Sequence, residues 1–294
     1  MSVSTIRKFD ILNGVIFVLV DRTTTVPLEA ATEIVQSTDS GQTWHRGKIA
    51  GLADFLFEDA QKGLLVISGK LHRTEDGGHT TAVAFSPPSP LRRLRKSDSA
   101  LVAISARQFY VSRDGGTNWI SYTPPTPDEG GIELLNVEIG GGRIVATDNR
   151  LHIFMTREKP EKWTAWTIPG LVQGVAFKDG LFYIITSEKN QVRVLSDQSL
   201  STIPIDADRG LKKLARFHDD LFCYGSDRFF LLSGPREFKT IMGPSNDLAV
   251  INGILMVSAN EAICAKPGPS LGVGGKLVRV IFDPPDIMEM TVVP

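Results

Sequence analysis

The segment Gly180-Leu-Phe-Tyr-Ile-Ile-Thr186 is one copy of a phrase that recurs along the whole chain. Each copy opens with a small or turn residue, continues with a mostly aliphatic run and closes with a small or polar residue. A strand that is apolar on nearly every residue is typically buried on both faces. Repetition at about 40 residues predicts one four-stranded sheet per copy. The seven copies begin at positions 14, 63, 100, 142, 180, 220 and 253.

The sequence around each phrase completes such a sheet. A strand precedes the phrase, as in 211–217, and two strands follow it, as in 107–112 and 119–122. The runs are short and rich in β-branched and aromatic residues, and only 27–33 is compatible with a helix. We predict an all-β, seven-bladed β-propeller of four-stranded antiparallel blades, with six blades as the alternative and a two-sheet sandwich as the competing class. A single domain, 1–294, is expected, with blades at 1–50, 51–86, 87–123, 124–170, 171–206, 207–243 and 244–294; strands at 5–9 and 286–293 could close the ring by sharing a blade.

Composition narrows the function classes. Hydrophobic residues make up 42% of the chain, charged residues 22%, and the formal net charge is -1. The hydrophobic fraction is too high for a disordered chain. The near-zero net charge gives the protein no general attraction to nucleic acid or anionic membranes. The longest aliphatic run, 15–20, is far shorter than the ~20 residues of a membrane helix. Two cysteines cannot make a disulfide framework. We therefore expect a protein without membrane insertion, either cytoplasmic or, if phage-encoded, in a virion.

A second motif marks the turn between the third and fourth strands. Its complete copy is Ser37-Thr-Asp39-Ser-Gly41-Gln-Thr43-Trp44, and a degraded copy occupies 156–163. In such a turn Asp accepts backbone N–H bonds, Gly supplies a positive φ, the hydroxyl caps the turn and Trp packs on the sheet. The structural residues predicted on this basis are Ser37, Asp39, Gly41, Thr43, Trp44, Thr74, Asp76, Gly78, Ser112, Asp114, Gly116 and Trp119.

These turns resemble the Asp-box, or BNR, repeat. That repeat occurs in sialidases, sortilin-type receptor ectodomains, photosystem II assembly factor-like propellers and many phage and bacterial propellers. The match covers the first half of the chain directly and the second half only through the strand phrase. The resemblance implies that the Asp-boxes lie on the face away from the ligand site, so Asp39, Asp76 and Asp114 are expected to be structural and not catalytic.

The residues needed for sialidase chemistry are not evident. That chemistry uses an arginine cluster, a Tyr–Glu pair and an acid/base Asp, and the family usually carries an Arg-Ile-Pro or Arg-Leu-Pro phrase near the start of the first blade. Here that region reads Ile6-Arg7-Lys8-Phe9, and no tyrosine has a Glu partner by spacing. The five histidines are scattered and join no Cys or carboxylate cluster. We predict a protein that is not an enzyme, with no catalytic residues, no metal and no cofactor.

Two basic segments are the candidate binding site. They occupy 91–96 and 211–216, each on the strand before a phrase, which lines the central channel of a propeller. The alternative is a channel lining whose charges are offset by the carboxylates of Asp54, Glu58, Asp59, Glu133 and Glu138. The candidate binding residues are Arg92, Arg93, Arg95, Lys212, Lys213 and Arg216.

The function expected from these features is a non-enzymatic scaffold for protein interaction or assembly. Its partner would be a protein, acidic or part of a multi-subunit particle such as a phage tail, with no nucleic acid involved. The connections 21–33 and 123–131 are expected to form loops on the binding face. A glycan-binding or sialidase-like glycoside hydrolase propeller is the alternative.

Overall fold

The structure is a computed structural model of the whole chain. It describes residues 2–25, 28–39, 43–125, 131–158, 162–188, 191–197, 199–205, 211–217, 219–225, 228–242, 253–258, 261–266, 276–282 and 285–291. For 2–5, 22–31, 217 and the strands from 253 onward, only the backbone is described. The described residues contain strands and turns but no helix, so none of this part of the chain offers a helix that could cross a membrane.

The strands form four-stranded antiparallel sheets, each from consecutive strands of the chain. This confirms the predicted all-β class and strand order. Each predicted blade boundary falls in a connection between two sheets. The chain divides into two compact units, residues 1–94 with 250–294 and residues 95–249. The division falls inside β9 (Leu91–Ser97).

The first unit holds three sheets. The N-terminal strand β1 pairs with β2 and the C-terminal strand β28 with β27, so the two termini do not share a sheet as the sequence had suggested. The strands are β1 (Ser2–Leu12), β2 (Val15–Thr25), β3 (Leu28–Ser37), β4 (His45–Lys48), β5 (Leu52–Phe57), β6 (Gly63–Ile67), β7 (Lys70–Thr74), β8 (Ala82–Phe85), β25 (Gly253–Ser258), β26 (Glu261–Lys266), β27 (Lys276–Phe282) and β28 (Pro285–Thr291).

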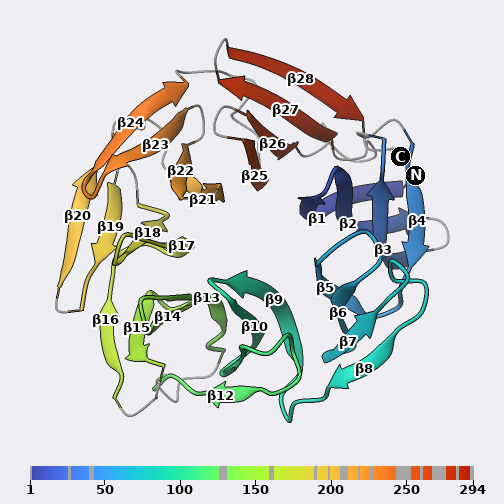
Figure 1. Ribbon diagram of the computed structural model, residues 1–294, viewed down its shortest axis with the longest axis horizontal. Coiled ribbons are helices and arrows are strands. Elements are labelled where there is room, and N and C mark those ends of the chain that lie inside the picture. The colour runs from blue at the N-terminus through green and yellow to red at the C-terminus, as the bar shows by residue number, and fades with distance from the viewer. Residues whose placement is uncertain are drawn as a thin grey trace. The chain divides into compact units, whose positions relative to one another are not determined.

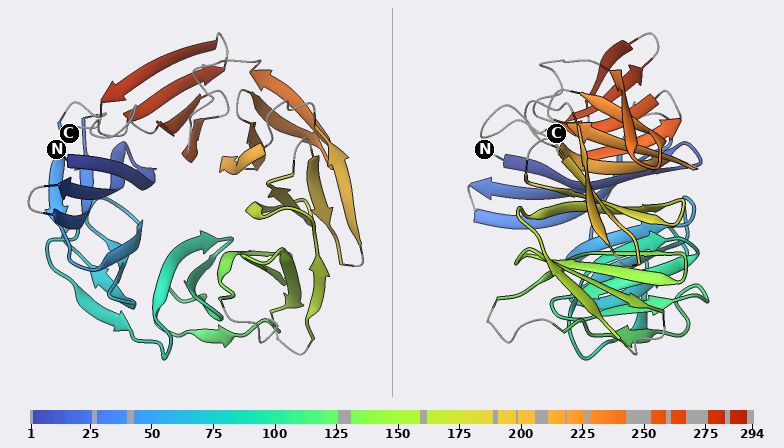
Figure 2. Two further views of the ribbon diagram at one scale, coloured as in Figure 1. Left: turned by 180° about the vertical axis from the view of Figure 1, so that it is seen from behind. Right: turned by 90° about the vertical axis from the view of Figure 1, so that its left-hand side faces the viewer.

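The second unit holds four sheets, the first of which begins with β9. In Figure 1 the first strand of each of these sheets lies on the inner side of the row and the fourth on the outer side, and Figure 2 shows the same succession from behind. The remaining strands are β10 (Ala100–Ser105), β11 (Phe109–Ser112), β12 (Ile120–Tyr122), β13 (Leu134–Gly140), β14 (Arg143–Asp148), β15 (His152–Arg157), β16 (Thr164–Thr167), β17 (Val172–Lys178), β18 (Leu181–Thr186), β19 (Gln191–Leu195), β20 (Leu200–Pro204), β21 (Leu211–Phe217), β22 (Asp220–Gly225), β23 (Phe229–Gly234) and β24 (Glu237–Met242).

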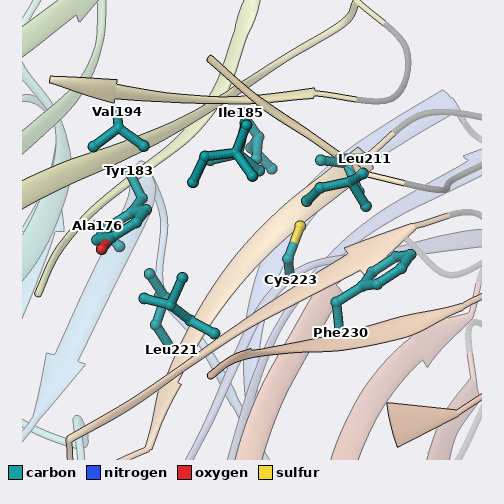
Figure 3. Packing of buried hydrophobic residues seen from close by; sticks show 12 residues of the cluster. Ala176, Tyr183, Ile185, Val194, Leu211, Leu221, Cys223 and Phe230 are labelled. Atoms are coloured by element: carbon teal, nitrogen blue, oxygen red, sulfur yellow. The ribbon is translucent and has the colours of Figure 1, made fainter. Parts of the chain in front are cut away.

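The hydrophobic pattern accounts for the position of each strand within its sheet. Every residue of β10 is buried, whereas β8 and β16 on the outer side are mostly exposed. The repeated phrase therefore marks the second strand, which is covered on both faces by neighbouring sheets. Figure 3 shows one such interface, where Tyr183, Ile185 and Val194 pack against Leu221, Cys223 and Phe230. Burial raises the pKa of the Cys223 thiol, which behaves here as a small apolar side chain.

The described residues of the segment 21–33, which are 21–25 and 28–33, form strands and neither a loop nor a helix. β2 and β3 pair from Ile16–Ser37 out to Thr25–Leu28, so most of 21–33 is a continuation of their hairpin. The β-branched residues Thr23, Thr24, Thr25 and Thr32 favour this extension over a helix. The polar positions still contact one another: the Asp21 carboxylate accepts hydrogen bonds from Thr32 Oγ1 at 2.9 Å and Arg7 Nη1 at 3.5 Å. Of the second predicted loop, residues 126–130 lie outside the described residues.

Candidate functional site

Three turns between third and fourth strands have the same hydrogen-bond network. In the turn after β7, Thr74 Oγ1 donates to Asp76 Oδ1 at 2.9 Å and accepts from the Gly78 N–H at 2.8 Å. The Asp76 carboxylate also accepts from the N–H and the hydroxyl of Thr80, at 2.8 and 2.6 Å. Both carboxylate oxygens of Asp76 are thereby used to hold the turn.

The turn after β11 repeats this network with different side chains. Ser112 takes the place of Thr74, and the Asn118 side-chain amide donates to Asp114 Oδ2 at 2.7 Å where Thr80 used its hydroxyl. Trp119 Nε1 donates to the Gly116 carbonyl at 3.0 Å. The Asn at 118, a departure from the usual Thr, therefore preserves the geometry because an amide N–H replaces an O–H donor.

The turn after β3 shows the same central aspartate. Ser37 Oγ donates to Asp39 Oδ1 at 2.8 Å, and Thr43 donates its N–H and hydroxyl at 2.8 and 2.6 Å. Trp44 packs against a cluster that includes Val18. The predicted glycine of this turn, Gly41, lies outside the described residues.

Hydrogen bonds to the ionised carboxylates dominate the electrostatics of these turns. Donation from Thr80 lowers the pKa of Asp76 to about 2, and donation from the Asn118 N–H and side chain lowers the pKa of Asp114 to about 2. A carboxylate whose ionised form is stabilised so strongly is a poor proton donor at neutral pH. The described aspartates of these turns therefore have the properties of structural groups.

The degraded fourth copy uses other contacts. Thr156 Oγ1 donates to the Lys162 carbonyl at 2.9 Å, and Trp163 packs edge-on against Phe109. Glu158, in the place of the aspartate, pairs with Arg113 from the preceding sheet. This contact joins two neighbouring sheets of the second unit at their turns.

The six candidate basic residues lie on the first strands β9 and β21. Arg92, Arg95, Lys213 and Arg216 are exposed, whereas Arg93 and Lys212 are partly buried. Lys212 Nζ lies 5.9 Å from the centre of the Tyr224 ring, and burial lowers the pKa of its ammonium. Within the second unit, Lys212 and Lys213 lie near the start of β21, while Arg216 lies near its end.

The charges of two of these arginines act on one carboxylate. Glu138, partly buried on β13, accepts hydrogen bonds from the Ser97 side chain and the Phe177 N–H. Burial raises its pKa to about 7, although the nearby charges of Arg95 and Arg216 favour its ionised form. The residues come from β9, β13, β17 and β21, so all four first strands of the second unit supply a group to this cluster.

The other carboxylates predicted to offset the basic residues behave differently. Glu58 and Asp59 follow the end of β5, and Glu133 precedes β13, so these three lie outside the first strands. Asp59 accepts the N–H groups of Gln61 and Lys62 in the turn before β6. The sequence analysis had placed these three carboxylates on first strands. Pairing with the second strand instead ends β5 before Glu58 and begins β13 after Glu133.

Asp54 on β5 forms a cross-strand contact that sequence reasoning missed. Its carboxylate accepts from Lys8 Nζ at 2.7 Å and from the Leu94 N–H at 2.7 Å. Lys8 also donates to the Phe55 carbonyl at 2.6 Å and lies over the Phe55 ring. No sequence motif marks this pair, since its partners are separated by a whole repeat.

Two features of the described residues bear on metal binding and on tyrosine chemistry. No group of three or more His, Cys, Asp or Glu in this part of the chain could hold a metal. The Tyr122 and Tyr183 hydroxyls donate to the Glu158 and Pro235 carbonyls, and burial raises the pKa of both phenols. A tyrosine nucleophile requires the opposite shift.

Comparison with known proteins identifies the fold. The sequence matches no protein-family model. It also matches no curated protein. Solved structures do match: YCF48 from Cyanidioschyzon merolae has 16% identity and a TM-score of 0.55, with 82% of this chain and 84% of that chain covered. A structure of YCF48 bound to D1 peptide has 16% identity and a TM-score of 0.56, with 83% of each chain covered.

Two further matches span nearly the whole chain. The β-propeller domain of the Trilobed protease from Pyrococcus furiosus, described as having an open velcro topology, has 11% identity, a TM-score of 0.62 and coverage of 99% of this chain and 96% of that chain. PorZ of Porphyromonas gingivalis has 14% identity and a TM-score of 0.61; 99% of this chain is covered, but only 39% of PorZ. At these identities the likeness shows the fold alone, which is a β-propeller.

Proposed function

We propose that this protein is a non-enzymatic β-propeller scaffold that binds an acidic protein partner through the first strands β9 and β21. The carrying observation is that β9 and β21, each the first strand of its sheet, carry three basic side chains apiece, and four of these six side chains are exposed. Exposed basic groups attract carboxylates and accelerate encounter with acidic proteins.

Two of the similar structures support a role in interaction or assembly. YCF48 was solved with a D1 peptide bound. PorZ is described as an essential bacterial surface component of the type-IX secretion system. We propose the same class of role here, in a cytoplasmic assembly or in a particle such as a phage tail.

The proposed scaffold is a single ring of seven blades. The support is the grouping of the described strands into seven four-stranded sheets, one for each copy of the sequence phrase. We further propose that the turns at Asp39, Asp76 and Asp114 are Asp-boxes. First-to-second and third-to-fourth turns share one end of each sheet, so the partner would bind at the opposite end, where β9 and β21 begin.

Charge reversal tests the binding surface. The probe is a fluorescein-labelled peptide of eight glutamates, followed by fluorescence anisotropy at low and moderate salt. Arg93→Glu combined with Lys213→Glu should weaken binding at low salt by about tenfold or more and flatten its salt dependence.

A matched control changes the net charge equally at another place. Lys48→Glu with Lys239→Glu alters exposed lysines on the outer strands β4 and β24 and should leave binding within about twofold. Equal losses in both double variants would mean that only net charge matters, and the proposed surface would be wrong.

A turnover assay tests the non-enzymatic assignment. A fluorogenic sialoside between about pH 5 and pH 7 should be hydrolysed no faster with micromolar protein than with heat-inactivated protein. A saturable rate that one arginine substitution abolishes would favour a glycoside hydrolase over a scaffold.

A further inference from the structure

Leu171 is a large apolar residue that is 40% exposed to solvent. Val83 and Ile120, the other large apolar residues that are exposed in the described part of the chain, lie on the outer strands β8 and β12. Leu171 instead immediately precedes β17, the first strand of its sheet. It therefore lies at the end of the sheet at which the proposed partner would bind.

Hydrogen bonds fix the backbone that carries this side chain. The Leu171 N–H donates to Ser187 Oγ at 2.8 Å, and the Leu171 carbonyl accepts from the Ser187 N–H at 2.8 Å. Both bonds tie Leu171 to the residue that follows β18. Three residues before Leu171, the Ile168 N–H donates to the Leu151 carbonyl at 2.9 Å. A partner that contacts Leu171 therefore has little backbone to order, and such preorganisation favours binding.

Basic residues lie on both sides of Leu171. On one side, the exposed Arg150 directly precedes Leu151 in the turn between β14 and β15. On the other side, the Gln173 amide, in the orientation that satisfies both of its polar atoms, donates to the carbonyls of Leu211 at 2.9 Å and Lys212 at 3.2 Å. These bonds hold the starts of β17 and β21 side by side (Figure 1). The Leu171 segment thus joins the turn of Arg150 to the strand of the candidate lysines.

The acidic residues of the two turns that hold this segment are engaged within the protein. Asp148, at the end of β14, is fully buried and lies 2.7 Å from His152 Nδ1. Glu188 accepts hydrogen bonds from Arg193 Nη2 at 2.6 Å and from the Gln191 side-chain amide. Burial and these contacts reduce the repulsion that either carboxylate exerts on an acidic partner. The surroundings of Leu171 are therefore complementary to negative charge.

We propose that Leu171 is the apolar anchor of the basic surface, so that the partner is an acidic segment whose large apolar side chain packs on Leu171. This inference rests on the proposed function and adds the chemistry of the partner segment. Protein interfaces commonly surround an apolar contact with a polar rim. Charge attraction acts on any acidic segment, whereas the apolar contact requires an apolar side chain at one position.

The experiment compares two fluorescein-labelled peptides that differ at one residue. Each has four glutamates on either side of a central residue, which is phenylalanine in one peptide and alanine in the other. Fluorescence anisotropy should show that the wild type binds the phenylalanine peptide about tenfold more tightly. Salt should weaken the binding of both peptides but leave their affinity ratio nearly unchanged, because salt screens charges and not the apolar contact.

Substitutions at Leu171 test whether this side chain makes the contact. Leu171→Ala should reduce the ratio to about twofold or less and leave the affinity for the alanine peptide within about twofold of wild type. Leu171→Met keeps an apolar side chain of similar volume and should retain most of the ratio. The matched control is Ile120→Ala, which removes an exposed apolar side chain from β12 and should also retain it.

The outcomes separate this inference from the proposed function. If the wild type binds the two peptides equally, or if Ile120→Ala removes the ratio as fully as Leu171→Ala does, the inference fails although the basic surface stands. If the wild type binds neither peptide, the proposed function fails and the inference fails with it.

Methyl NMR locates the contact directly. In protein with carbon-13 leucine methyl groups, the Leu171 signals are assigned by their loss in Leu171→Met. The phenylalanine peptide should shift these signals through the ring current of its aromatic side chain, and the alanine peptide should leave them nearly in place. Ring-current shifts at other leucines, with Leu171 unmoved, would place the apolar contact elsewhere and overturn the inference.

Discussion

One carboxylate holds each of three turns between third and fourth strands. Asp76 accepts from a side chain before it and from both donors of Thr80 after it, which closes the turn around a single acidic group. Asp114 does the same with Ser112 and Asn118. The aspartate of each turn is therefore used to hold local structure.

The low pKa values of these aspartates predict acid sensitivity with a definite sign. Because the folded pKa of Asp76 and Asp114 is about 2, below the usual value of 3.8, each contributes stability above about pH 4. That contribution is lost as the pH falls toward 2. Carboxyl NMR should show both midpoints near 2.

A single substitution tests whether the pKa of each aspartate is set by the donors of its own turn. Thr80→Val removes the hydroxyl donor but keeps the N–H, so the pKa of Asp76 should rise toward its usual range while that of Asp114 stays at about 2. Equal shifts at both sites would show that the turns are coupled through the fold and not held by their own donors.

Asp39 provides a test of stability. Asp39→Ala removes the acceptor for Ser37 and for both donors of Thr43, which should lower the free energy of unfolding by about 1–3 kcal/mol. Thermal unfolding should move downward by a few degrees, while peptide binding by the folded protein stays unchanged. Thr38→Ala, at the exposed neighbouring position, is the control; a loss of binding without a loss of stability in Asp39→Ala would contradict a structural role.

At the scale of the strand, the first strands share an irregularity. Pairing with the second strand shifts register between Leu52 and Asp54, Leu134 and Asn136, Val172 and Gly174, and Leu211 and Lys213. A bulge changes which face the following side chains take. The repeated bulge therefore fixes the orientation of Asp54 and Lys213, the residues on which the inner surface depends.

Adjacent first strands also approach closely. A Cβ at Gly140 on β13 would lie 2.1 Å from ring atoms of Phe177 on β17. Gly140→Ala should therefore force the ring to move and lower the free energy of unfolding by about 1–3 kcal/mol, measured by urea denaturation.

Two further variants check the cause of that loss. Gly47→Ala, where the nearest atom to a new Cβ is 3.5 Å away, should change the free energy of unfolding little. Adding Phe177→Leu to Gly140→Ala should recover part of the loss. An additive double variant would rule out steric overlap as the cause.

At the scale of the whole molecule, one strand shared by the two compact units predicts that the protein unfolds cooperatively. The two compact units divide inside β9, so neither can unfold completely without disturbing a strand that continues into the other. We expect one calorimetric transition at neutral pH, as for a single domain. Two separate transitions, with one set of backbone amides exchanging before the other, would show instead that the units unfold independently.

The sequence by itself determined the class of fold, the order of strands and the chemistry of the Asp turns. These features depend on local periodicity and on residues close together in the chain, as in Ser37–Trp44. The same local rules could not place 21–33, because its extension into a hairpin depends on pairing across β2 and β3.

Only the tertiary structure decided which charged residues of the first strands lie near one another. Lys8 with Asp54, and Glu138 with Arg95 and Arg216, are separated by one or more repeats, so no spacing in the sequence identifies them. Their proximity depends on the packing of neighbouring sheets. Electrostatic energy depends on distance and burial in space, and the order of residues along the chain fixes neither.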